Sequence, residues 1–128
     1  MARARARIAE TRYRVDLKAG HHDLVADEHP DLGGQDAGPA PYELLLAALG
    51  ACTSITLKMY AERKDWPLTA IDVSLLFTRE GEQGRIERTL TLEGDLDEAQ
   101  RARLADIAER TPVTLTLKSG VEINTRLS

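Results

Sequence analysis

A ten-residue stretch of almost entirely apolar or small residues constrains the fold of this 128-residue chain more than any other feature. It runs from Tyr42 to Ala51, holds a single charged residue, Glu43, and leads directly into Cys52, the only cysteine. Pro41, just before it, suits the first turn of a helix, where its missing N–H is not needed. The pattern predicts a long helix from Pro41 to about Arg63.

This helix is predicted to lie between two subunits. Leu44 to Leu49 leave no polar stripe, so this half of the helix is expected to be surrounded by protein on all sides. One small core cannot easily wrap a helix completely, whereas a second subunit would cover the remaining face. The sequence therefore predicts an intimate homodimer. Because the stretch Tyr42–Leu57 is shorter than the roughly 20 apolar residues that cross a bilayer, no membrane contact is expected.

Strand patterns precede the helix. Tyr13, Val15 and Leu17 alternate with polar residues, which predicts a strand, and a turn ending at Gly20 leads to a second strand, His21 to Ala26. The basic start "MARARARIAE" is interpreted as a frayed or strand-forming terminus. The next fifteen residues, "DEHPDLGGQDAGPAP", contain three prolines and three glycines and are predicted to form a loop.

Two further strands, a helix and a closing strand are predicted after the long helix. "AIDVSLLFTREG" and "GRIERTLTLEGDL" form a hairpin around Gly81 to Gly84, with Arg88 as the polar exception on an apolar face that is therefore expected to be exposed or twisted there. "LDEAQRARLADIAERT" is an amphipathic helix with Asp95 or Asp97 as its N-cap. Pro112 ends that helix or starts another turn, and "VEINTRL" is a closing strand. The order favours one α+β domain, residues 1–128, with an antiparallel sheet.

Composition and charge exclude several functions. The net charge of −4, with lysine and arginine spread along the chain, gives no reason to expect a nucleic-acid partner. The N-terminal residues lack the apolar stretch of a secretory signal. One cysteine allows no internal disulfide framework, and a cytoplasmic location is expected.

Cys52 has two interpretations from the residues alone. A free cysteine in an apolar helix is usually a small hydrophobic side chain, and burial makes it inert. A position in the middle of the helix also denies it the dipole stabilisation of an N-terminus. If the thiol reacts, a cation or hydrogen-bond donor from elsewhere must stabilise its thiolate.

Three other polar residues are candidates. His21 and His22 are expected to point to opposite faces of a strand and so not to chelate one ion, and with no other ligand spacing no metal or cofactor is expected. Glu43 in the first helical turn suits the positive end of the helix dipole; its functional interpretation is a carboxylate that orients a cation. Glu43 and Cys52 are nine residues apart, about 13 Å along the axis, so they cannot touch within one helix.

The segment from Ala26 to Leu68, "ADEHPDLGGQDAGPAPYELLLAALGACTSITLKMYAERKDWPL", resembles the OsmC/Ohr family, the osmotically inducible protein C and organic hydroperoxide resistance proteins. The later segments "RIERTLTLEGDLDEAQRARLADIAERTPV" and "VEINTRL" are also similar to it. The resemblance implies an α+β fold with a long central helix, in an intertwined homodimer. It implies that Cys52 occupies the place of the family's peroxidatic cysteine, which attacks an organic hydroperoxide and is resolved by a second cysteine in a "CPV" segment.

The chain departs from the family pattern at three places. Thr111 stands where the second cysteine belongs, and a threonine cannot form a disulfide. Peroxidase members carry an arginine near the first hairpin turn, where this chain has Gly20-His21-His22. They also carry a glutamate directly after the helix-starting proline, where this chain has Tyr42, with Glu43 one place later.

Two functions follow from the resemblance. The first is a thiol-dependent hydroperoxidase in the peroxide stress response. In it Cys52 is oxidised and then restored by an external thiol or dithiol, with His21 or His22 as activator, Glu43 orienting a cation and Thr111 at the position of the missing thiol. The second is a non-catalytic homodimer that binds a small apolar ligand, with Cys52 as part of the pocket wall.

Overall fold

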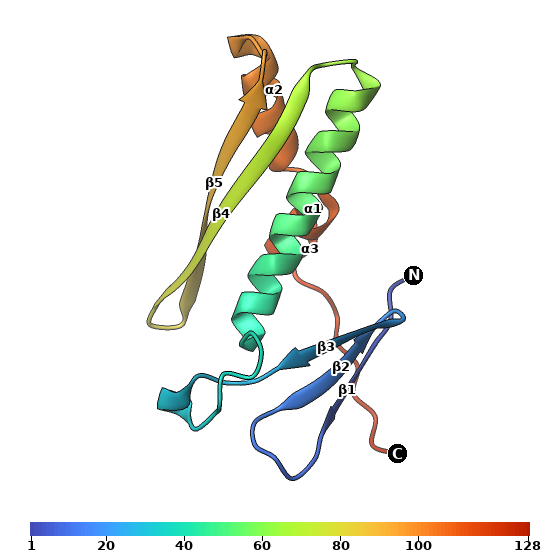
Figure 1. Ribbon diagram of the computed structural model, residues 1–128, viewed down its shortest axis with the longest axis vertical. Helices are drawn as coiled ribbons and strands as arrows, with labels where there is room; N and C mark the ends of the chain where they lie inside the picture. The colour runs from blue at the N-terminus through green and yellow to red at the C-terminus, as the bar shows by residue number, and fades with distance from the viewer. The chain divides into compact units, whose positions relative to one another are not determined.

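The computed structural model describes residues 1–128, and it is an α+β fold with antiparallel sheets and three helices. Its elements are β1 (Ala4–Ile8), β2 (Val15–Ala19), β3 (His22–Ala26), a 3-10 turn η1 (Pro30–Leu32), α1 (Pro41–Arg63), β4 (Leu68–Glu80), β5 (Gln83–Gly94), α2 (Glu98–Ala108) and α3 (Pro112–Ser119). The chain forms two compact units, residues 1–45 (unit 1) and residues 46–128 (unit 2), and helix α1 begins in the first and continues through the second (Figure 1).

Unit 1 contains a three-stranded antiparallel sheet in the order β1-β2-β3. Val15 pairs with both Ile8 and Ala26, so β2 is the central strand. The basic terminus is therefore strand-forming, one of its two predicted states. β2 and β3 are joined by Gly20 and His21, and Gly20 has a φ of 62°, a conformation that costs glycine little.

A single buried carboxylate organises the loop that follows β3. Asp27 accepts hydrogen bonds from four backbone N–H groups, those of Tyr13, Glu28, Gln35 and Ala37, at 2.7 to 3.3 Å. Burial raises the pKa of this carboxyl, but the four amide hydrogen bonds together outweigh that effect and bring the pKa below its ordinary value. The loop between β3 and α1 is therefore held together by hydrogen bonds to the buried carboxylate of Asp27.

Asp27→Asn is expected to destabilise the protein at neutral pH, because the amide places two N–H donors among backbone N–H groups. Since the pKa of Asp27 is lowered on folding, its contribution to stability is present above the unfolded-state pKa and is lost as pH falls through the folded-state value. Urea unfolding from pH 7 to pH 3 should therefore show a steeper acid loss for the wild type than for Asp27→Asn. Asp31→Asn, in the same loop but exposed, is the control; equal acid slopes in wild type and Asp27→Asn would contradict this prediction.

Unit 2 packs α1 along a long hairpin. β4 and β5 are antiparallel and joined by Gly81-Glu82, within the predicted turn, and α1 runs along the hairpin (Figure 1). The core combines α1, β4 and α2 with the segment that precedes α2. Its buried members are Leu57, Ala61, Leu68, Leu96, Leu104 and Ala108.

The helices after the hairpin begin at well-defined caps. Asp97 is the N-cap of α2 and forms a capping box with Gln100, which confirms one of the two predicted caps. Pro112 starts α3, with Thr111 as its N-cap. The predicted closing strand "VEINTRL" is wrong for the single chain: residues 120–128 form no strand, and their side chains are exposed because no neighbouring strand is available to pair with them.

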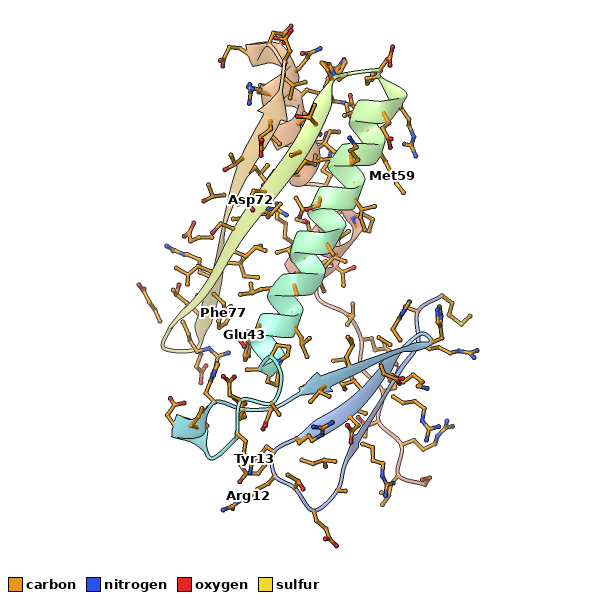
Figure 2. The ribbon with its side chains drawn as sticks, in the orientation of Figure 1. Arg12, Tyr13, Glu43, Met59, Asp72 and Phe77 are labelled. Carbon is orange, nitrogen blue, oxygen red and sulfur yellow. The ribbon has the colours of Figure 1, made fainter.

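Helix α1 has the predicted bounds, Pro41–Arg63. Its buried residues repeat every four positions as Leu49, Thr53, Leu57 and Ala61. An opposite row that includes Ile55 and Met59 is about half exposed, and Met59 projects away from the hairpin (Figure 2). One face of this apolar helix is thus left uncovered within the subunit.

The expectation that this segment is too short to cross a membrane is not supported by the structure. The 23-residue α1 is long and apolar enough to do so, with a mean hydropathy of 1.5 in its most apolar window. Core helices of soluble proteins have the same length and composition, so this feature by itself assigns no membrane.

Candidate functional site

Cys52 lies in the middle of α1, one residue before the buried Thr53, and is a half-buried free thiol. Within unit 2 its sulfur makes one hydrogen-bond contact, 3.9 Å from Thr56 Oγ1, one helical turn further on. The thiol is therefore partly accessible. Its activating cation, which the sequence required from elsewhere, is not among these contacts.

Thr111 is fully buried at the corner between α2 and α3. Its hydroxyl lies 2.6 Å from Thr114 Oγ1 and caps the first turn of α3 through the backbone N–H of Thr114. Thr111, which the resemblance predicts to stand in place of the family's second cysteine, thus has a defined structural role as an N-cap. Such caps typically contribute about 1 kcal/mol.

Arg88 connects this corner to the helix that carries Cys52. Its Nη1 donates to Thr53 Oγ1 at 3.0 Å and to Thr114 Oγ1 at 2.9 Å, and its Nη2 donates to the carbonyl oxygen of Ala108 at 2.9 Å. Nη2 also lies 3.3 Å from the carboxylate of Glu109. Of the two predicted states of the β5 face at Arg88, exposed or twisted, the exposed one is wrong: the side chain is 11% exposed, because hydroxyl and carbonyl oxygens from three helices surround it.

Glu109 lies between two cations at the end of α2. The hydrogen bond and the charge of Lys118, followed by the charge of Arg88, lower the pKa of this carboxyl. It is exposed, with Lys118 Nζ 3.0 Å from Oε1. The contribution of this ion pair to stability is small because water screens it.

Glu43 lies in the first turn of α1, in unit 1 (Figure 2). Its Oε1 accepts a hydrogen bond from the backbone N–H of Ala40 at 2.8 Å, which is the structural role that the sequence allowed. Its Oε2 lies 3.6 Å from Nε2 of His29, whose Nδ1 lies 3.7 Å from Asp36. The cation that Glu43 meets, when His29 is protonated, is a histidine that the sequence analysis did not select; only its place in the loop before the helix pointed to it.

His21 and His22 do not point to opposite faces, contrary to the prediction. Their ring centroids are 4.0 Å apart, because His21 belongs to the turn and only His22 to the strand. Both are exposed. Across the described chain, no group of three or more His, Cys, Asp or Glu side chains is arranged to hold a metal ion.

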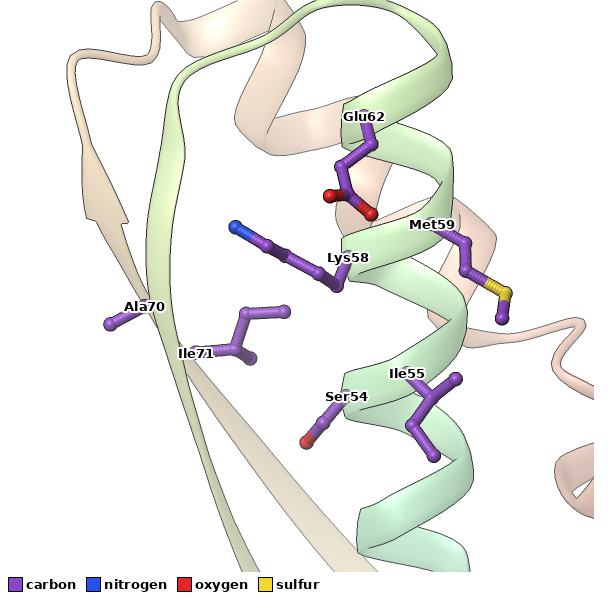
Figure 3. Close-up of a pocket in the computed structure, with 7 residues that line it drawn as sticks. All are labelled: Ser54, Ile55, Lys58, Met59, Glu62, Ala70 and Ile71. Carbon is purple, nitrogen blue, oxygen red and sulfur yellow. The ribbon is translucent and has the colours of Figure 1, made fainter.

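A surface groove of about 450 Å³ in unit 2 is lined by residues of α1 and β4 (Figure 3). Its walls are largely apolar, including Ile55, Met59 and Ile71, and Lys58 extends toward β4, where Nζ donates to the carbonyl oxygen of Leu68 at 2.8 Å. Ser54 lies at one end, two residues from Cys52. The groove offers apolar contact with few polar groups.

A separate polar cluster surrounds Tyr60 at the end of α1. Arg103 Nε donates to the tyrosine oxygen at 3.0 Å, and this hydrogen bond lowers the pKa of Tyr60. Asp106 contacts both Arg103 and Arg110, and the hydrogen bond from Arg110 lowers the pKa of its carboxyl. These groups are largely exposed and tie α2 to α1.

Comparison with known proteins gives a family match and a fold match. Residues 33–126 match the family model described as OsmC-like protein. The structure is similar to an OsmC like protein from Mycoplasma pneumoniae, with 18% identity and a TM-score of 0.80 over 92% of this chain and 87% of that one. It is also similar to the organic hydroperoxide resistance protein OhrB of Bacillus subtilis, with 21% identity and a TM-score of 0.64 over 95% and 93%.

A third solved structure of the same kind is an organic hydroperoxide resistance protein OsmC from Legionella pneumophila, with 20% identity and a TM-score of 0.65 over 92% of this chain and 89% of that one. At these identities the likeness establishes the fold. The comparison with curated proteins gave no match.

Proposed function

The chain belongs to the OsmC-like family, and on that premise we propose that it reduces organic hydroperoxides through Cys52 and is restored by an external thiol. The observation that carries the proposal is a free, half-buried thiol in the middle of the central helix, and the resemblance implies that this thiol takes the place of the family's peroxidatic cysteine. Partial exposure suits a nucleophile, since a fully buried thiol is inert.

The reaction balances without an internal partner. The thiolate sulfur of Cys52 attacks one peroxide oxygen; the S–O bond forms, the O–O bond breaks, and the departing alkoxide takes a proton to become an alcohol. Cys52 is oxidised by two electrons to sulfenic acid. One external thiol then condenses with it, releasing water and forming a mixed disulfide, and a second thiol releases Cys52 by exchange.

The supporting groups belong to this proposal. Thr111 holds the second-cysteine position as a buried hydroxyl, and Glu43 and one of the histidines His21 and His22 are the candidates for completing the site in the assembled protein. The protein is proposed to act as a cytoplasmic homodimer. The uncovered face of α1, which includes Ile55 and Met59, supports that assembly, because a second helix would remove these side chains from water.

A second candidate function is binding of a small apolar ligand without turnover. It is favoured by the lack of a cation among the contacts of Cys52 in unit 2 and by the hydroxyl at position 111. Two measurements distinguish the functions. In a binding protein, Cys52 would be alkylated slowly and no hydroperoxide would be consumed.

The test is the stoichiometry of peroxide consumption. With cumene hydroperoxide and no added thiol, the protein is expected to consume one equivalent per subunit in forming sulfenic acid, because Cys52 is its only cysteine; each higher oxide formed by excess peroxide consumes one further equivalent. Mass spectrometry should find sulfenic acid at Cys52, then higher oxides as peroxide rises. Cys52→Ser should consume none. Consumption by Cys52→Ser, or none by the wild type, would contradict the proposal and favour ligand binding.

A further inference from the structure

Arg88 is a cation placed on the inner face of β5, where its neighbours in the two-residue pattern, Ile86 and Leu90, are apolar. All four of its hydrogen-bond contacts go to groups on helices or at their ends. Three of these acceptors belong to residues that are buried: Thr53, Thr114 and Ala108. Arg88 keeps all of these hydrogen bonds only when the acceptor oxygens from the different helices are held around it together.

The hydrogen bonds around Arg88 form one consistent pattern. Thr53 donates its hydroxyl proton to the carbonyl of Leu49, which leaves its oxygen free to accept from Arg88. Thr114 donates to the carbonyl of Ala108, which leaves its oxygen to accept from Arg88 and from the hydroxyl of Thr111. No buried side-chain nitrogen or oxygen is left without a partner.

These contacts join two parts of unit 2. The first is the α2–α3 corner, Ala108 to Thr114. Arg88 donates to the carbonyl oxygen of Ala108 at the end of α2, where a helix leaves its last carbonyls without intrahelical partners, and to the hydroxyl oxygen of Thr114 in the first turn of α3. The second is the turn of α1 that holds Thr53, the neighbour of Cys52.

Stability alone does not account for an arginine and its polar partners here, because well-packed apolar residues of similar volume often replace a complete buried ion pair at no cost. The guanidinium group is planar and holds its N–H donors in a rigid geometry. It can therefore make all of these hydrogen bonds in only one arrangement of the three helices. We propose that Arg88 is a positioning residue that holds the α2–α3 corner, and Thr111 within it, against the turn of α1 that carries Cys52. The proposal rests on the proposed function, since it assigns Arg88 to the reaction site of Cys52.

The test measures this placement directly, in a Thr111→Cys background. Glutathione redox buffers report the effective concentration of the two thiols, because disulfide formation between positions 52 and 111 reduces one glutathione disulfide to two glutathiones. Adding Arg88→Met is expected to lower that effective concentration about tenfold or more, as expected for loss of hydrogen bonds to a charged donor. Arg88→Lys should recover part of the lost effective concentration, because the ammonium group restores the positive charge but not the planar set of donors.

Thr53→Val isolates the tie to α1. It removes the acceptor for Arg88 while keeping the shape of the side chain, and it should lower the effective concentration by roughly threefold, a smaller effect since Arg88 keeps its other partners. Ser54→Ala is its matched control: Ser54 makes the same bond to the carbonyl four residues earlier but does not contact Arg88. Arg85→Met, exposed on the same strand, is the control for arginine loss. Neither control should change the measurement.

Three outcomes would overturn the proposal. They are no disulfide in Thr111→Cys, an unchanged effective concentration in Arg88→Met, and an equal loss in Thr53→Val and Ser54→Ala. If Arg88→Met does not fold, the comparison of Thr53→Val with Ser54→Ala decides alone. Because the buffers contain no hydroperoxide, the result does not depend on the peroxide reaction, whose failure the consumption assay detects separately.

Discussion

Thr111→Cys is expected to raise the steady-state consumption of hydroperoxide with a dithiol reductant well above that of the wild type, in which an external thiol must itself reach the sulfenic acid of Cys52. The introduced thiol lies at the position matched to the family's second cysteine. Three contacts link Thr111, through Thr114 and Arg88, to Thr53 beside Cys52. A thiol at 111 should condense with the sulfenic acid of Cys52, release water, and form a disulfide that the dithiol reopens, provided the two Cα atoms lie within about 7 Å.

The measurement is the steady-state consumption of cumene hydroperoxide with dihydrolipoamide, compared between wild type and variant. Thr111→Ser, which keeps the capping hydroxyl, is the control and should turn over no faster than the wild type. The substitution to cysteine also weakens the cap of α3, so the variant is expected to be less stable by about 1 kcal/mol. A disulfide without turnover would point to the altered activating groups, the missing arginine and the shifted Glu43, as the deeper loss and would favour a binding role.

Ile55→Asp is expected to abolish the homodimer or raise its dissociation constant about 100-fold or more. Ile55 is 54% exposed in the subunit, so the subunit itself offers no reason for a large effect. At a dimer interface, however, the aspartate would be an unpaired charge removed from water, which costs several kcal/mol. Sedimentation velocity across a concentration series reports the dissociation constant.

Leu32→Asp is the control for this prediction, because Leu32 is 63% exposed and lies in the loop before α1 rather than on it. It should leave the dimer unchanged. A wild type that sediments as a monomer at micromolar concentration would contradict the expected assembly, and so would an Ile55→Asp protein that dimerises as tightly as the wild type.

The sequence by itself determined the elements whose causes are local. Proline at position 41 and the apolar residues after it set the course of α1, and the capping aspartate before α2 set the start of that helix. The alternating residues on either side of Gly81 specified the β4–β5 hairpin. In each case the residues that cause the structure are next to it in the chain, so periodicity and capping rules suffice. The family resemblance likewise depended on continuous segments: the segment Ala26–Leu68 selected Cys52, and the later segment that ends in "ERTPV" selected Thr111.

Only the tertiary structure decided how the polar residues are partnered. Arg88 looked like an interruption of an apolar face, yet it binds a hydroxyl 35 residues earlier and another 26 residues later, and no local pattern reveals such pairs. The contact of His29 with Glu43, 14 residues later, depends on the course of the loop around Asp27, which no local pattern reveals. The prediction of a closing strand was wrong for the same reason. Alternation in "VEINTRL" indicates a preference for extended backbone, but a strand forms only where another strand supplies hydrogen-bond partners. The single chain supplies no such strand there.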